Sequence, residues 1–198
     1  MMSKKFPTEK FEKLRSEERL TEMPPEKFIE TLEFKEEMVI ADIGVGVGVH
    51  AILAAQKLSK LDGAVLAIDV EEFMLEETRR AAEETGLTNI QYHLAETVDL
   101  KLEPNSIDLA YLIAVFHEFP DPEKALHQIW TALKPNGWIY IVDMNLKAHP
   151  EERGPPDEHR IPLPKALAYV MKLSPFVKAT NEFYPNKYLI QVQKKERV

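Results

Sequence analysis

The sequence contains 198 residues, of which 44% are hydrophobic, and it carries a formal net charge of −8. This length fits one domain with a sizeable core, and the acidic charge argues against a long nucleic-acid-binding surface, because phosphate binding needs a basic face. The lack of cysteine excludes disulfides and any thiolate nucleophile or metal site. No apolar stretch approaches the roughly 20 residues of a membrane span, and the first residues lack a signal peptide's apolar segment, so we expect a cytoplasmic protein.

Two helices are predicted before the first strand. Residues 8–20 place Phe11 and Leu14 on one helical face. Pro24 and Pro25 begin a second helix that extends to about residue 34, since proline is tolerated in a first helical turn. Two roles are open for these helices: packing against the core, or covering a ligand as a lid.

Residues 38–51 are the most informative stretch of the chain. The apolar, β-branched run 38–43 predicts a buried parallel strand. Glycine follows at every second position, at Gly44, Gly46 and Gly48, before the start of a helix. Glycine permits a positive φ and lets backbone N–H groups approach a ligand closely. Nucleotide-like ligands bind at the first strand-to-helix turn of a doubly wound sheet, so this turn is the candidate ligand site.

The glycine-rich turn is compatible with two ligand classes. Counted from Asp42, its spacing Asp-x-Gly-x-Gly-x-Gly is the form found in methyltransferases that use S-adenosylmethionine (SAM). Counted from Gly46, its spacing Gly-x-Gly-x-x-Ala is acceptable for a dinucleotide. Residues 64–69 predict the next strand, which ends at Asp69, where a carboxylate can accept hydrogen bonds from both ribose hydroxyls. NAD and SAM both carry that ribose, and a glycine-rich turn without a ligand is a third alternative.

The rest of the chain alternates helices and strands. The polar, proline-rich residues 144–160 predict a long loop, and long loops are often functional. Residues 176–183 and 188–193 alternate like strands and predict a closing hairpin. This order predicts an α/β fold with a parallel sheet. The other predicted elements are helices over residues 71–85, 121–133 and 163–173 and strands over residues 89–94, 106–115 and 138–143.

Six short motifs follow one another between Val39 and Asp143. They are Asp42-Ile-Gly44-Val-Gly46-Val-Gly48, Ala67-Ile-Asp69, Ala95-Glu96-Thr97, Asn105-Ser-Ile-Asp108-Leu, Val115-Phe-His117-Glu-Phe-Pro-Asp121-Pro and Leu133-Lys-Pro135-Asn-Gly137. In this order and spacing the stretch resembles the class I SAM-dependent methyltransferases of the broad group that includes the ubiquinone- and menaquinone-biosynthesis enzymes (methyltransferase type 11). The third motif departs from the family's usual Gly-Asp-Ala.

The resemblance implies a doubly wound, Rossmann-like, seven-stranded sheet that is mostly parallel, with an antiparallel C-terminal strand and helices on both faces. We expect one methyltransferase domain over residues 1–198. Its parts are the N-terminal helices (1–37), the cofactor-binding core (38–143), an active-site loop (144–160) and a C-terminal helix with a β-hairpin (161–198).

The resemblance also implies which residues bind SAM. The turn at Gly44, Gly46 and Gly48 would present backbone N–H groups to the methionyl carboxylate. Asp42 would hold the turn or the methionyl ammonium. Asp69 would accept charge-assisted hydrogen bonds from the ribose hydroxyls.

A second set of residues is implied for the adenine ring. Glu96 would accept a hydrogen bond from the adenine amino group, and the alternative for Glu96 is a solvated loop carboxylate. Val70 and Thr97 would line the adenine pocket. Ala95, in the same motif as Glu96, completes the cofactor-binding set.

The catalytic residues are harder to identify from the sequence than the cofactor-binding residues, because methyl transfer from a sulfonium mainly requires alignment of the reacting atoms. A base is needed only if the nucleophile carries a proton. His117, past the end of the strand over 106–115, is the candidate base, with a structural or helix-capping role as the alternative. Asp143, at the end of the next strand, is a second wall of the pocket. His159 and Arg160 would hold an anionic group of the substrate or, alternatively, tie the loop down.

We therefore expect a SAM-dependent methyltransferase that acts on a small-molecule acceptor, without a metal ion and without a nucleic-acid partner. The alternative is a protein of the same fold that binds SAM or a metabolite without turnover. An NAD(P) oxidoreductase is a further alternative, supported by the glycine spacing from Gly46 alone. The oligomeric state is open, with a homodimer as one alternative.

Overall fold

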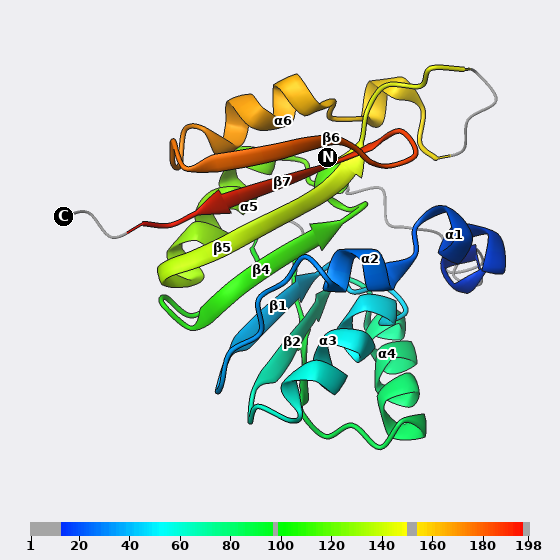
Figure 1. Ribbon diagram of the computed structural model, residues 1–198, viewed down its shortest axis with the longest axis vertical. Coiled ribbons are helices and arrows are strands. Elements are labelled where there is room, and N and C mark those ends of the chain that lie inside the picture. Colours follow the sequence, from blue (N-terminus) through cyan, green and yellow to red (C-terminus); the bar gives the residue numbers. More distant parts are fainter. Residues whose placement is uncertain (1–12, 97–98, 150–153, 196–198) are drawn as a thin grey trace. The chain divides into compact units, whose positions relative to one another are not determined.

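The computed structural model describes residues 13–96, 99–149 and 154–195 (Figure 1). These residues fall into two compact units, one ending at Glu96 and the other beginning after it. Within the described residues, no helix is both long enough and apolar enough to cross a membrane.

The first unit contains three parallel strands in the order β3-β2-β1. They are β1 (Val39–Ile43), β2 (Ala64–Asp69) and β3 (Ile90–Leu94), each within a residue of its predicted bounds. Helices α3 (Val49–Leu58) and α4 (Glu72–Glu84) pack on β2 and on each other. Fully buried alanines on α3 allow this close packing, namely Ala51, Ala54 and Ala55.

The N-terminal part of this unit differs from the prediction. The described portion of the predicted helix over residues 8–20 is interrupted at Ser16, whose hydroxyl accepts a hydrogen bond from the N–H of Arg19 (3.3 Å). Ser16 thereby caps a new helix, α1 (Glu17–Glu22). Helix α2 (Pro25–Ile29) begins as predicted but ends well before residue 34. Residues 8–12 lie outside the described residues.

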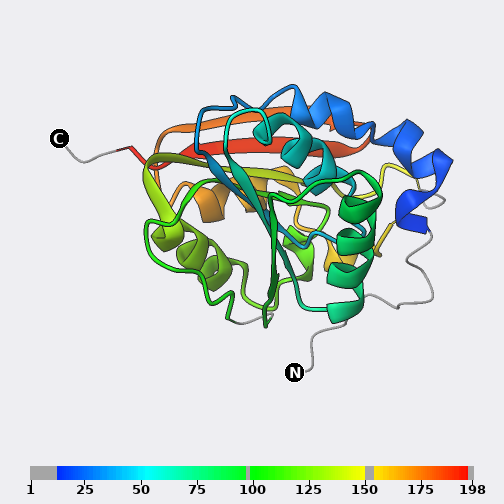
Figure 2. The same ribbon diagram turned by 90° about the horizontal axis from the view of Figure 1, so that it is seen from below.

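The second unit contains four strands in the order β4-β5-β7-β6. Strands β4 (Ile107–Ile113) and β5 (Leu133–Met144) are parallel, whereas β7 (Lys187–Gln193) is antiparallel to both β5 and β6 (Val177–Tyr184). The hairpin of β6 and β7 is orange and red in Figure 1 and Figure 2. Helix α5 (Pro122–Ala132) packs on β5, and α6 (Leu163–Val170) packs on β7.

Two strand boundaries in the second unit were predicted incorrectly. Strand β5 begins at Leu133, which already pairs with Ile107, whereas the next pair joins Leu109 to Trp138. Residues 134–137 therefore form an irregularity within the strand and not a separate turn. Strand β4 ends at Ile113, two residues early, where Ala114 adopts a positive φ of 55°. A short 3-10 helix, η2 (Phe116–Glu118), follows.

The predicted fold class is confirmed: a Rossmann-like α/β fold of seven strands, mostly parallel, with an antiparallel C-terminal strand and flanking helices. The expectation that residues 1–198 form one methyltransferase domain stays a prediction.

Candidate functional site

The turn between β1 and α3, residues 44–48, takes its shape from its glycines. Gly44, Gly46 and Gly48 have φ values of 75°, 55° and 80°, which lie in the left-handed region. The N–H of Gly44 donates to the carbonyl oxygen of Ile68 (2.8 Å), which ties the turn to the end of β2. A side chain at any of these glycines would strain the backbone.

Gly48 has a second reason to lack a side chain. A Cβ atom there would lie 2.7 Å from Cγ2 and 2.8 Å from Oγ1 of Thr78. Thr78 is fully buried on α4, and its hydroxyl donates to the carbonyl oxygen of Gly46 (3.0 Å). Gly48 therefore allows α4 to pack against the turn, a structural role that the sequence pattern does not separate from ligand binding.

Asp69, the last residue of β2, points its carboxylate at the same turn. Its Oδ2 atom accepts the N–H of Gly46 (2.9 Å), and its Oδ1 atom accepts the N–H of Glu71 (3.0 Å). Burial raises the pKa of Asp69 above its usual value, although the backbone hydrogen bonds act in the opposite direction. Val70 is a third backbone hydrogen-bond partner of this carboxylate, which has about four acceptor positions, and a hydroxyl donor at the remaining one would stabilise this poorly solvated charge. The geometry therefore fits a ribose.

The segment before α1 also contacts the glycine turn. Arg15 donates from Nη2 to the carbonyl oxygens of Val47 (2.9 Å) and Glu77 (3.3 Å), and its Nη1 lies 3.8 Å from Oε2 of Glu77. A Cβ at Gly46 would come 3.5 Å from Cδ1 of Leu14. These contacts are compatible with both alternatives for the N-terminal helices, packing and a lid. The sequence gives no signal for Arg15, because its partners are 32 and 62 residues away.

The other predicted cofactor residues differ in burial. Asp42 is buried and Val70 is half-buried. The N–H of the buried Ala95 donates to the backbone carbonyl of Asp69 (2.9 Å), so the third motif begins beside the ribose candidate. Glu96 is exposed. The predicted position Thr97 lies outside the described residues.

His50, in the first turn of α3, was not singled out from the sequence. Its ring contacts Phe28 edge-on, with 5.9 Å between ring centroids. Burial and, to a smaller extent, the charge of Arg19 lower the pKa of His50 to about 3, so the ring is neutral at pH 7. Its Nε2 atom is buried and has no hydrogen-bond partner among the described residues.

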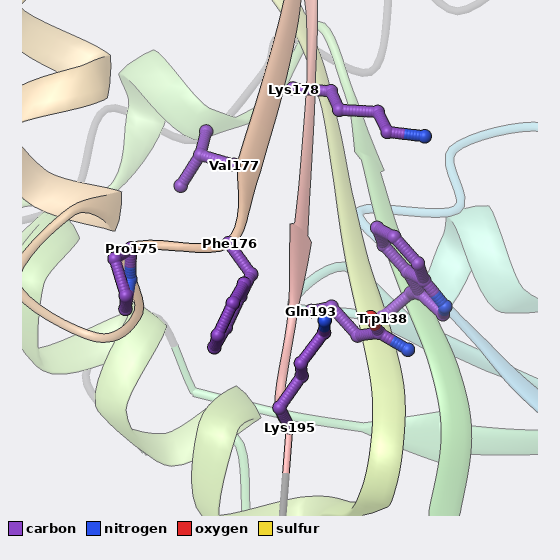
Figure 3. Close-up of a pocket in the computed structure, with 7 residues that line it drawn as sticks. All are labelled: Trp138, Pro175, Phe176, Val177, Lys178, Gln193 and Lys195. Carbon is purple, nitrogen blue, oxygen red and sulfur yellow. The ribbon is translucent and has the colours of Figure 1, made fainter.

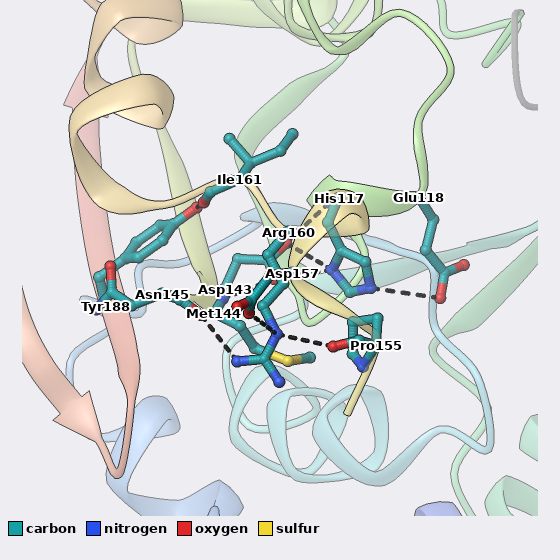
Figure 4. Close-up of polar contacts among 10 residues, drawn as sticks. All are labelled: His117, Glu118, Asp143, Met144, Asn145, Pro155, Asp157, Arg160, Ile161 and Tyr188. Carbon is teal, nitrogen blue, oxygen red and sulfur yellow. Dashed lines mark hydrogen bonds and ion pairs between the residues drawn. The ribbon is translucent and has the colours of Figure 1, made fainter. Parts of the chain in front are cut away.

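In the second unit, the structure brings His117 and Asp143 together (Figure 4). The Nδ1 atom of His117 lies 2.8 Å from Oδ1 of Asp143, and the N–H of His117 donates to Oδ2 (2.9 Å). The N–H of Met144 donates to Oδ1 of the same carboxylate (2.7 Å). The Asp143 side chain has no exposed surface, and that of His117 is 6% exposed.

The Asp143 carboxylate fixes the protonation pattern of the imidazole. Because a carboxylate only accepts hydrogen bonds, Nδ1 of neutral His117 carries the proton and Nε2 keeps its lone pair. Burial by itself would lower the pKa of His117, but the Asp143 hydrogen bond and the charges of Asp143 and Glu118 outweigh it and raise the pKa. Arg160 opposes them. The result is a ring that, when neutral, can accept a proton at Nε2.

The two predicted substrate-binding residues lie in different surroundings. His159 is exposed at the end of a 3-10 turn, η3 (Asp157–His159). The Arg160 side chain is 1% exposed, and it donates from Nε to the carbonyl oxygen of Pro155 (2.9 Å) and from Nη1 to that of Asn145 (2.8 Å). The guanidinium group is therefore directed into its own loop.

A pocket of about 440 Å³ lies elsewhere in the second unit (Figure 3). Trp138, on its wall, precedes Asp143 by five residues on β5, a separation of roughly 16 Å along an extended strand. Among the residues that the structure describes, no carboxylate or imidazole lines this pocket. Its lining consists of Trp138, Pro175, Phe176, Val177, Lys178, Gln193 and Lys195.

Comparison with known proteins adds to this geometry. Residues 34–186 match a family described as a methyltransferase domain. A ubiquinone biosynthesis O-methyltransferase from Hydrogenovibrio crunogenus is 28% identical over 120 residues, which are 60% of this chain and 48% of the relative. The uncharacterized methyltransferase YcgJ from Bacillus subtilis is 29% identical over 115 residues, which are 58% of this chain and 44% of the relative. The chain thus spans about half or less of the curated relatives it matches.

Solved structures agree over a larger part of the chain. A SAM-dependent methyltransferase from Aquifex aeolicus superposes with a TM-score of 0.84 at 25% identity, covering 96% of this chain and all of the other. A Haemonchus contortus phosphoethanolamine N-methyltransferase 2, solved in complex with SAM, superposes with a TM-score of 0.67 at 20% identity. It covers 82% of this chain and 38% of that one, and it supports the fold alone.

Proposed function

This chain belongs to the family of class I SAM-dependent methyltransferases, and we propose that it methylates a small molecule whose nucleophilic atom carries a proton. His117 is the general base in this proposal. The observation that carries it is the buried hydrogen-bonded pair of His117 and Asp143, with 2.8 Å between Nδ1 and Oδ1. Methylation of a thioether or a tertiary amine would not need such a pair, because those nucleophiles have no proton to lose.

The first unit supplies the residues that would hold SAM. The first N–H groups of α3 have no intrahelical acceptor and suit the methionyl carboxylate. In the turn before them, the N–H groups of Gly44, Gly46 and Gly48 already donate within the unit, so the turn would shape this site and not donate to the ligand through those groups. Asp69 would accept a ribose hydroxyl beside its backbone hydrogen bonds from Gly46, Glu71 and Val70. Bound SAM would supply a methyl group already activated by the sulfonium. The protein therefore has to align the acceptor with the methyl group and remove the acceptor's proton.

The second unit supplies the base. Asp143 holds the Nδ1–H of His117, so Nε2, which lies 3.9 Å from Oε1 of Glu118, keeps its lone pair for the acceptor's proton. Bound SAM would give its methyl group to the acceptor atom and leave as S-adenosylhomocysteine, and Nε2 of His117 would receive the acceptor's proton. Asp143 then stabilises the imidazolium without taking the proton, in the manner of a catalytic triad aspartate. Such base catalysis typically contributes about 10²–10⁴-fold to the rate.

Hydroxyl and amino acceptors both meet this requirement. The named relatives include an O-methyltransferase and an N-methyltransferase, which supports testing both classes. The test is a screen of phenols, alcohols, amines, thiols and thioethers for S-adenosylhomocysteine release. We expect activity with acceptors that carry an O–H or N–H and a strong loss in His117→Ala. Turnover of a thioether that is equal in the wild type and in His117→Ala would overturn the proposal.

A second candidate function is binding of SAM or a metabolite without turnover. The observation that favours it is the low exposure of the His117 side chain, which is 6%. Calorimetric binding of SAM together with no S-adenosylhomocysteine release from any acceptor class would favour this candidate over the enzyme.

A further inference from the structure

We propose that Arg160 is a positioning residue that fastens the loop after β5 beside Asp143 and thereby holds the His117–Asp143 pair. This inference rests on the proposed role of His117 as the base. It assigns Arg160 to the loop and not to an anionic group of the acceptor.

The hydrogen bonds of Arg160 connect the two ends of that loop. Its Nη1 atom donates to the carbonyl oxygen of Asn145, two residues after Asp143, and its Nε atom donates to the carbonyl oxygen of Pro155 (2.8 and 2.9 Å). Asp157 lies 3.8 Å from Nε and also accepts the N–H of Lys147 (2.9 Å). One buried guanidinium therefore links residues that directly follow β5 to residues ten positions later.

Gly154 packs closely against the guanidinium of Arg160. Its φ of 101° is unfavourable for any side chain. A Cβ there would lie 3.0 Å from Sδ of Met144 and 3.2 Å from Nη2 of Arg160. Met144 is the residue whose N–H donates to Asp143. The loop, the guanidinium and the strand end that carries Asp143 are thus in direct packing contact.

Tyr188 holds Ile161, the residue that follows Arg160, in place. It is fully buried and pairs with Asp143 across β5 and β7. Its hydroxyl donates to the carbonyl oxygen of Ile161 (2.8 Å), as Figure 4 shows. Burial and the charge of Asp143 raise the pKa of Tyr188, so the phenol stays protonated as a donor. Arg160 is therefore held by its own hydrogen bonds and by the hydrogen bond from Tyr188 to Ile161, the residue after it. These bonds keep the guanidinium from turning toward a ligand.

The positive charge of Arg160 also acts on the base. The charged groups that influence His117 are Asp143 on β5, Glu118 on η2 and Arg160 in the loop. The two carboxylates raise the pKa of His117, and Arg160 lowers it. Loss of the charge alone would raise the pKa of His117, whereas loosening of the His117–Asp143 hydrogen bond would lower it. An Arg160 that only bound an anionic acceptor would leave both the loop and this hydrogen bond unchanged in the free protein.

Two measurements on the full chain test this inference without an acceptor. The first is the pKa of His117 from the pH dependence of its ring ¹H–¹³C NMR signal, assigned among the six histidines by His117→Gln. The second is amide hydrogen exchange of Gly154 and of residues 157–161. Arg160→Met should speed this exchange about tenfold or more, since hydrogen bonds from a charged donor are lost. Arg160→Lys keeps the charge, so it should speed the exchange and lower the pKa of His117, because a loosened pair weakens the Asp143 hydrogen bond that raises this pKa.

Lys178→Met is the matched control, because it removes an exposed positive charge from β6 in the same unit. It should change neither measurement. If Arg160→Met does not fold, Arg160→Lys carries the exchange test alone. Unchanged exchange in the Arg160 variants would overturn the inference, even if the pKa of His117 moved. Because neither readout needs turnover, a failed acceptor search would count against the proposed function and not against this inference.

Discussion

Asp143 holds His117 by two different groups at once: its Oδ1 atom lies 2.8 Å from the ring Nδ1, and its Oδ2 atom accepts the backbone N–H at 2.9 Å. The two residues are 26 positions apart in the sequence. They meet because β4 and β5 are adjacent and parallel, with Ile113 paired to Val142, so the chain leaves both strands at the same edge. His117 follows the first strand, and Asp143 lies at the end of the second.

Asp143→Asn should lower the methyl-transfer rate by about 10²-fold or more, because the uncharged amide no longer stabilises the imidazolium. SAM affinity measured by calorimetry should stay close to that of the wild type. Asp108→Asn is the control, since Asp108 is also a carboxylate of this unit but pairs with Lys134 at a partly exposed position (2.8 Å). Equal rates for wild type and Asp143→Asn would mean that the carboxylate does not assist His117.

The stability of the protein should depend on pH through His117. Because the pKa of His117 in the folded protein is raised above its ordinary value of 6.5, protonation favours the folded state. The stabilisation is fully present below pH 6.5 and is lost as the pH rises through the folded-state pKa. Urea unfolding should show that His117→Gln loses more stability at about pH 5.5 than at about pH 8.5. A loss independent of pH would contradict the raised pKa.

Gly48→Ala should destabilise the fold more than Gly46→Ala. Both have a positive φ, which costs about 1 kcal/mol with a side chain, but only the Cβ at position 48 meets Thr78 at 2.7 Å. Overpacking of this kind costs a further ~1–3 kcal/mol. Denaturant unfolding measures both changes, and Thr78→Ala should restore part of the stability in the Gly48→Ala background. Equal losses for the two glycine variants would show that α4 moves away without penalty.

Asp69→Asn should weaken SAM binding without unfolding the protein. Loss of a charged hydrogen-bond acceptor costs roughly 1.5–3 kcal/mol, which is about a ten- to hundredfold increase in Kd. Calorimetry with SAM and S-adenosylhomocysteine measures the change, and NAD should not bind comparably. Asp62→Asn, at an exposed turn position, is the control. If Kd is the same in the folded Asp69 variant, Asp69 does not contact the ribose.

The regular parts of this fold could be predicted because their local patterns agree with their surroundings. The run before the glycine turn has the composition of a buried strand, and β1 begins and ends within a residue of its predicted bounds. Predicted element boundaries were wrong where the local sequence pattern was weak or where pairing with a distant strand determined the structure. Ser16 caps a new helix within a segment of helical composition, and pairing of Leu133 with Ile107 extends β5 through residues that usually form a turn.

The candidate site residues could be proposed from the sequence, but the contacts between them could not. Motif spacing pointed to His117 and Asp143 separately, whereas their hydrogen bond depends on the register of β4 and β5. Arg160 was singled out for its charge, and its carbonyl partners follow from the path of the loop. The packing of Thr78 against Gly48 likewise needs two elements to be in place.

The most direct test of the central claim is the pH dependence of S-adenosylhomocysteine release with the most active acceptor, measured for wild type and His117→Ala between about pH 5 and pH 9. In the wild type the rate should rise with pH through a pKa above 6.5, the ordinary value for histidine. His117→Ala should lose that dependence and be slower by about 10²–10⁴-fold, with unchanged SAM affinity. A His117→Ala protein that keeps the same acidic limb and a rate near that of the wild type would remove His117 from the mechanism.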